Sequence, residues 1–97
     1  MDDIINYLIK KLEEDLTKEE VIYSGNILFS DLDRLCEQVV KLSPNRPDLY
    51  KNIYQLNTYI NLNWEDQRFD LVERQTKKLI ELVRKEGGDD WCRLASR

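Results

Sequence analysis

Histidine is missing from all 97 residues of this chain, and glycine, proline and cysteine are rare. Without histidine the chain cannot hold a Ser-His or Cys-His catalytic pair, a histidine general base or a histidine-ligated zinc ion. It also has no glycine-rich phosphate-binding loop of the GxGxxG or Walker type. We therefore predict a protein that is not an enzyme and that holds no metal and no cofactor.

Cysteine and long apolar runs are scarce as well. Cys36 and Cys92 lie far apart in the sequence, and no secretory leader precedes them, so both are expected to be free thiols in a reducing cytoplasm. Cys36 is expected to act as a small buried apolar residue. No apolar run reaches the ~18 residues that a membrane span requires. We expect a soluble, cytoplasmic protein without a transmembrane segment.

Basic residues are fewer than acidic ones. The 15 basic residues against 19 acidic ones give a net charge of −4 and a pI near 4.8. A surface that neutralises nucleic-acid phosphates is therefore not expected. Apolar residues make up 41% of the chain, which is enough for one core, and the length fits one domain.

Apolar residues recur at helical spacing and predict four amphipathic helices. The first covers residues 2–16. The second covers residues 17–42 and starts at "TKEE", which has the pattern of a capping box between Thr17 and Glu20.

The second helix carries a heptad seam that keeps its phase across Gly25. This favours one continuous or kinked helix. The alternatives treat "YSGN" as a turn, either within a hairpin or before a new helix capped by Ser30. The seam consists of Val21, Gly25, Leu28, Leu32, Leu35, Val39 and Leu42.

The segment "SPNRPD" interrupts the helical pattern. Pro44 and Pro47 keep the residues before them out of helical geometry, and Pro47 suits the first position of a helix. A third helix is predicted over residues 47–62. A fourth is capped by Asn63 and ends at Gly87, the first of two glycines.

Four such helices with short links predict an all-α protein, an antiparallel four-helix bundle with a short C-terminal tail. Residues 1–88 form the single domain and residues 89–97 the tail. The acidic clusters "EED" at 13–15 and "DLD" at 31–33 fit solvated helix ends better than magnesium or calcium sites.

One segment, "NIYQLNTYINLNW" at residues 52–64, has no charge in a chain of which 35% is charged. Beside the predicted core stripe of this helix lie Tyr50, Tyr54, Asn57 and Asn61, one flank of the helix. Such residues are typical of protein interfaces, where charge is depleted. Equally, they can cover the junction of the second and third helices. Trp64 fits a hinge that packs between the third and fourth helices.

The C-terminal segment "GGDDWCRLASR" allows a similar choice. Trp91 and Leu94 are costly to leave in water, so they dock either onto the bundle or onto a partner.

The chain resembles the small bacteriocin immunity proteins of lactic acid bacteria, of the lactococcal and pediocin-like classes. The resemblance lies in the length, in "KLEEDLTKEE", in "SPNRPDLYKNIYQL" and in the ending "GGDDWCRLASR". Many proteins of that family are neutral or basic, whereas this chain is acidic, which argues against docking on a membrane face.

The resemblance implies a stoichiometric, non-catalytic cytosolic helical bundle. Such a protein binds a membrane receptor, the mannose permease of the phosphotransferase system, once the bacteriocin has engaged it. Specificity then lies in the second half of the chain and the tail. This points to Tyr50, Tyr54, Asn57, Asn61, Trp91 and Arg93 as partner-binding residues.

Two functions follow from these patterns. The first is a protein-binding module of the immunity or inhibitor type, active as a monomer. The alternative is a homo-oligomeric structural, assembly or regulatory protein, for example phage-encoded, which buries the same helix against a second copy.

Overall fold

The computed structural model describes the backbone of residues 2–95 and the side chains of residues 4–85. Over this part of the chain the structure consists of helices and the short links between them, without a strand, so the predicted all-α class is confirmed. Within the same residues, no helix is both long enough and apolar enough to cross a membrane. The helices are α1 (Asp2–Asp15), α2 (Glu19–Ser24), α3 (Asn26–Leu42), α4 (Pro47–Glu65) and α5 (Phe69–Ala95).

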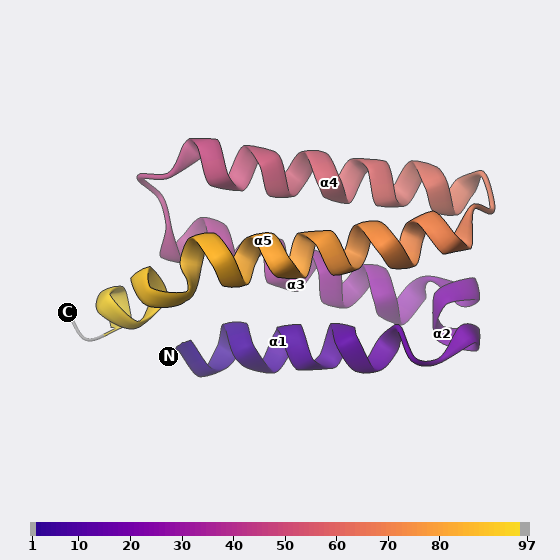
Figure 1. Cartoon of the computed structure of the whole chain (residues 1–97), viewed down its shortest axis with the longest axis horizontal. Helices are drawn as coiled ribbons and strands as arrows, with labels where there is room; N and C mark the ends of the chain where they lie inside the picture. The colour runs from indigo at the N-terminus through magenta and orange to yellow at the C-terminus, as the bar shows by residue number, and fades with distance from the viewer. Residues whose placement is uncertain (1, 96–97) are drawn as a thin grey trace.

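The four long helices lie side by side along the long axis of the molecule, and the chain reverses direction at each connection between them (Figure 1). α1 packs mainly on α3, and α4 mainly on α5, while α3 also contacts α4 and α1 contacts α5. The short α2 crosses one end and contacts α3 and α5. The radius of gyration, 13.1 Å, is that of a compact domain of this length.

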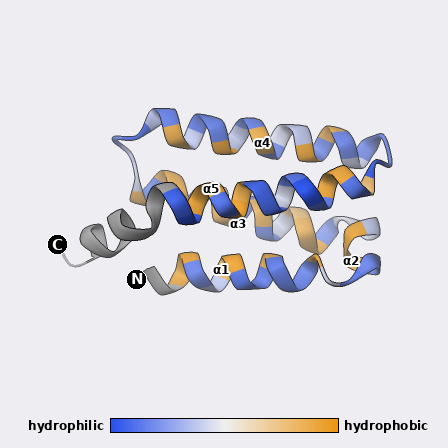
Figure 2. Ribbon diagram, viewed as in Figure 1, coloured by the Kyte–Doolittle hydropathy of each residue, from blue (hydrophilic) through white to orange (hydrophobic). Residues whose placement is uncertain are grey.

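Every long helix turns an apolar stripe inward, and Figure 2 shows these residues as recurring hydrophobic bands. The predicted stripes supply most of this core, because residues three and four apart share one face of a helix. The largest side chains that are wholly buried are Ile5, Ile9, Leu12, Leu28, Leu32, Leu35, Val39, Ile53, Ile60, Val72, Leu79 and Val83.

The predicted second helix is broken at Gly25. This residue has a φ of +77°, ends α2, and donates its N–H to the Val21 carbonyl oxygen at 3.1 Å. The expectation of one continuous or kinked helix was therefore wrong. The hairpin alternative was wrong because both flanking segments are helices. The alternative of a break before a new helix was right about the break but wrong about the cap, because α3 begins at Asn26 and not at Ser30. Glycine permits this left-handed conformation since it has no Cβ.

The side chain of Trp64 covers the break between α2 and α3. Its indole Nε1–H donates to the Ile22 carbonyl oxygen at 2.9 Å, and its ring meets Phe29 edge to face with centroids 5.6 Å apart. A Cβ at Gly25 would lie 2.9 Å from two carbons of the indole. Trp64 thus packs on the α2–α3 junction and not, as predicted, between the third and fourth helices.

Two predicted caps are not formed. The Thr17 hydroxyl donates to the Glu14 carbonyl oxygen at 2.6 Å, at the end of α1, and α2 has no side-chain cap. Asn63 lies inside α4, where its side chain donates to Gln75 Oε1 at 2.7 Å. In both places the side chain forms its hydrogen bond with a neighbouring turn or helix and not with the helix that it was expected to cap. The capping pattern in the sequence does not reveal this partner.

The bounds of α4 and α5 agree with the predictions only in part. α4 begins at Pro47, as predicted, but runs past residue 62 to Glu65. It ends in a Schellman motif with Gln67 at a φ of +61°, where the Arg68 N–H donates to the Asn63 carbonyl oxygen at 2.8 Å. α5 continues through Gly87 to Ala95, so the predicted helix end there was wrong. Glycine weakens a helix by about 1 kcal/mol without forbidding it.

We expect Gly25→Ala to lower the free energy of unfolding by about 2–4 kcal/mol. The added methyl group forces a left-handed conformation on a non-glycine residue and presses on the Trp64 ring. Thermal and urea unfolding followed by circular dichroism measures the change.

Ser30→Ala, an exposed site inside α3, serves as the control and should change stability by less than about 0.5 kcal/mol. Equal stability of the Gly25→Ala variant and the native chain would contradict the role of the turn.

Candidate protein-binding surface on helix α4

The uncharged stretch lies wholly within α4, between Lys51 and Glu65. More than half of it faces solvent, and we call these exposed residues the uncharged face. Among them Tyr54, Tyr59 and Leu62 leave 43%, 46% and 51% of their surface accessible. The members of the uncharged face are Asn52, Tyr54, Gln55, Thr58, Tyr59, Asn61 and Leu62.

The helix geometry sets which residues face outward. Leu49, Ile53 and Ile60 are buried in the core, so the residues on the opposite side of α4 point to solvent. α4 packs mainly on α3 and α5, with Trp64 at its end reaching α2, and Figure 1 shows it along one edge of the molecule. Its outer side is therefore open along its whole length within the described part of the chain.

The four helix residues predicted to bind a partner divide into two pairs. Tyr50 is half-buried and packs on the core, and Asn57 is buried with 9% exposure. Tyr54 and Asn61 are exposed. One pair therefore packs on the core, with Asn57 at the α3–α4 junction, and the other pair remains open to solvent.

Asn57 ties α4 to α3. Its side-chain amide donates to Asp33 Oδ1 at 3.2 Å. Asn61 in turn donates to the Asn57 carbonyl oxygen at 2.7 Å and to its Oδ1 at 3.3 Å. A buried amide is costly unless it is hydrogen-bonded, so this network fixes the rotation of α4 and with it the direction of the uncharged face.

Tyr59, Gln55 and Leu62 were not among the predicted binding residues, although they lie on the most exposed side of α4. The Gln55 amide donates to the Tyr59 hydroxyl at 3.3 Å, one turn apart on the helix. The lack of charge along the entire stretch was the signal that could have included them. Trp91 and Arg93, the two predicted residues of the tail, and Cys92 have side chains outside the described residues.

Two titratable groups, Tyr54 of the uncharged face and Cys36 of α3, stay neutral near pH 7. Burial raises the pKa of the Cys36 thiol to about 12, and the charge of Asp33 acts in the same direction. The pKa of Tyr54 is raised by burial and by the neighbouring Cys36 and Glu37. Cys36, with 1% exposure, is the small buried residue that the sequence predicted. It is a thiol and not a thiolate, and so a poor nucleophile.

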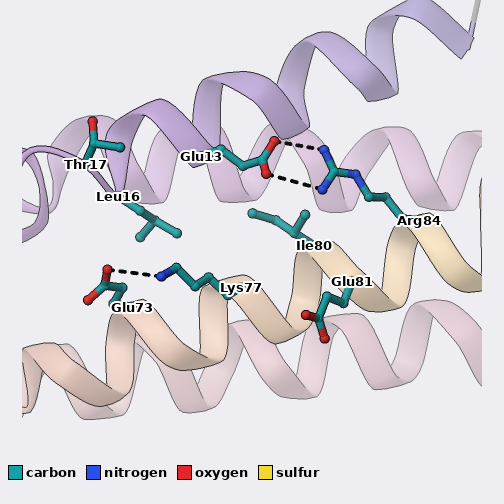
Figure 3. Close-up of a pocket in the computed structure, with 8 residues that line it drawn as sticks. All are labelled: Glu13, Leu16, Thr17, Glu73, Lys77, Ile80, Glu81 and Arg84. Carbon is teal, nitrogen blue, oxygen red and sulfur yellow. Dashed lines mark hydrogen bonds and ion pairs between the residues drawn. The ribbon is translucent and has the colours of Figure 1, made fainter.

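A groove between α1 and α5 is the other notable surface feature (Figure 3). It has a volume of about 430 Å³, and Leu16 and Ile80 contribute its apolar side chains. Ion pairs at the surface span or flank it, and each contributes up to about 1 kcal/mol. The groove thus runs along the line where α1 and α5 pack together. The pairs are Glu13–Arg84, with N–O distances of 2.8 and 3.3 Å, and Glu73–Lys77 at 3.4 Å.

The two acidic clusters are not simply solvated helix ends. Asp15 and Asp31 are buried, with 6% and 2% exposure, while Asp33 and the glutamates at 13 and 14 are exposed. The reason is that α1 packs against α3, which brings one carboxyl group from each cluster into their interface. Among the described side chains, no group of three or more metal-ligating residues gathers there or elsewhere.

Comparison of the sequence with protein-family models finds no match, and neither curated proteins nor solved structures match it. The function must therefore be argued from the surface of α4.

We expect Asn57→Ala to lower the free energy of unfolding by about 1–2 kcal/mol, because the network between α4 and α3 loses its central amide. Asn52→Ala, an exposed site on the same helix, is the matched control and should be nearly neutral. Urea unfolding of both variants provides the comparison. Equal stabilities would show that Asn57 does not hold α4 in place.

Proposed function

We propose that this chain is a non-catalytic protein-binding module, an antiparallel four-helix bundle that binds a protein partner through the uncharged face of α4. One observation carries the proposal. In a chain with 35% charged residues, residues 52–64 of α4 have none, and the exposed residues among them include Tyr54, Tyr59 and Leu62.

The chemistry of the face supports docking of another protein. Burying a charge in an interface requires its removal from water, which costs several kcal/mol unless a partner charge compensates. Tyrosine contributes a large apolar ring with a polar tip, and exposed Asn, Gln and Thr side chains form hydrogen bonds with many partners. A thirteen-residue helical face extends about 20 Å, which is enough to fill a groove or to pack on another helix.

The rigidity of α4 also supports the proposal. The helix is held from below by Ile53 and Ile60, from the side by Asn57, and at its end by Trp64. A surface that is ordered before binding loses less conformational entropy when the partner docks. The same contacts keep Tyr54 and Tyr59 available, because neither is required to fill the core.

The more specific proposal is an immunity-type or inhibitor-type protein of the cytoplasm. It is supported by the resemblance of "KLEEDLTKEE" and "SPNRPDLYKNIYQL" to bacteriocin immunity proteins. In that role the chain binds a membrane receptor or a toxin–receptor complex from the cytoplasmic side, in a stoichiometric complex. Trp91 and Arg93 then extend the contact beyond α4.

Site-specific cross-linking tests the binding module. A photoreactive phenylalanine analogue replaces Tyr59 on the uncharged face, and in the matched control it replaces Tyr7, a tyrosine of α1 with 60% exposure. In cells of the native host, we expect a strong adduct with a different polypeptide from position 59 and little from position 7. Tyr54→Ala in the same chain should weaken the adduct at least tenfold while the far-ultraviolet spectrum stays unchanged.

The nature of the adduct separates the alternatives. The immunity-type proposal expects a membrane receptor that cross-links only after exposure to the bacteriocin. An adduct between two copies of this chain would support the homo-oligomeric alternative. Equal labelling from positions 59 and 7 would contradict a binding role for α4.

A further inference from the structure

Two aspartates face each other inside the protein. Asp15 is the last residue of α1, and Asp31 lies in the second turn of α3. They are 94% and 98% buried, and the Oδ2 atom of each has no hydrogen-bond partner within the described part of the chain. The two carboxyl groups are close enough to share a hydrogen bond. Such a bond requires a proton, because two carboxylates have only acceptors.

The surroundings do not compensate two negative charges. Asp15 lies at the C-terminal end of α1, where the helix dipole is negative and disfavours a carboxylate. On the same helix Lys11 favours the charged form of Asp15, while Glu14 opposes it. α5, the other helix that packs on α1, directs Arg84 and Lys77 to the groove beside Glu13, and neither acts on Asp15.

Burial is the main reason that Asp15 retains its proton, followed by the hydrogen bond to Asp31 and the negative charge of Asp31. Together they raise the pKa of Asp15 from 3.8 to about 7. Asp15 therefore gains or loses its proton close to neutral pH, next to the negative charge of Asp31. Two like charges at hydrogen-bonding distance in a buried interface repel strongly.

We propose that Asp15 and Asp31 form a proton-dependent latch, in which one shared proton holds the end of α1 against α3. When the proton leaves, the two carboxylates push this end of the interface apart. α2 follows α1 after a short link, so the latch also controls how firmly α2 lies across the end of the bundle. The pair lies in α1 and α3, whereas the uncharged face is on α4, so this inference does not depend on the proposed function.

The sign of the pH dependence follows from linkage. The pKa of Asp15 is higher in the folded chain than in the unfolded one, so the folded state binds more protons. The stabilisation is fully present below a pH of about 4 and disappears as the pH rises through about 7. The latch is closed in mildly acidic conditions and opens in mildly alkaline ones.

Unfolding of the whole chain in urea, measured from pH 5 to pH 8, tests the latch. Asp15→Asn keeps the shape of the side chain and supplies a permanent N–H donor toward Asp31, which imitates the protonated carboxyl group. Relative to this variant, the unfolding constant of the native chain should rise by up to tenfold per pH unit between about 5 and 7. Asp31→Asn should weaken the same pH dependence without removing it, because Asp15 stays buried but loses the negative charge of Asp31.

Glu37→Gln, an exposed carboxylate on α3, is the matched control with the same change of charge and should keep the native pH dependence. Amide hydrogen exchange locates the effect. At pH 8, α1 and α2 of the native chain should be less protected than in Asp15→Asn, while α4 should be equally protected in both. Identical pH profiles for the native chain and Asp15→Asn would overturn the proposal, as would a Glu37→Gln profile that matches Asp15→Asn.

Discussion

The left-handed turn at Gly25 is the constraint on which the packing of this protein depends. It lets the chain end α2 and begin α3 within one residue, so that the apolar seam of α3 can face both α1 and α4. Trp64, from the end of α4, covers the turn and bonds to the Ile22 carbonyl oxygen. A contact between residues distant in sequence thus fixes the end of the bundle, and with it the orientation of α4.

The sequence predicted the parts of the fold that local patterns control. Helical periodicity located the inward stripes, and Pro47 marked the start of α4, because both signals lie within one segment. The break at Gly25 was only the less favoured alternative, because a kinked helix and two helices separated by one residue have the same heptad phase. Thr17 and Asn63 were predicted to be caps from their residue types and positions. In the structure their side chains donate hydrogen bonds to Glu14 and Gln75 and not to the first turn of a helix.

For the candidate surface, too, the local sequence predicts less than the packing of the helices decides. The absence of charge drew attention to α4, but did not show which side of it faces solvent. Asn57 is buried where it meets its partner Asp33 from α3, and Tyr59 is exposed on a side of α4 that no helix covers within the described residues. Asp15 and Asp31 were expected to be solvated, since nothing in either cluster reveals that the other carboxyl group lies opposite.

We propose that the uncharged face stays free for a different protein. The mass in solution, measured by light scattering behind a sizing column over a hundredfold range of concentration, tests this proposal. We expect the mass of a single chain, 11.7 kDa, at every concentration. A stable dimer or larger assembly that dissociates when Tyr59 and Leu62 are replaced by lysine would contradict it, because the face would then serve self-association.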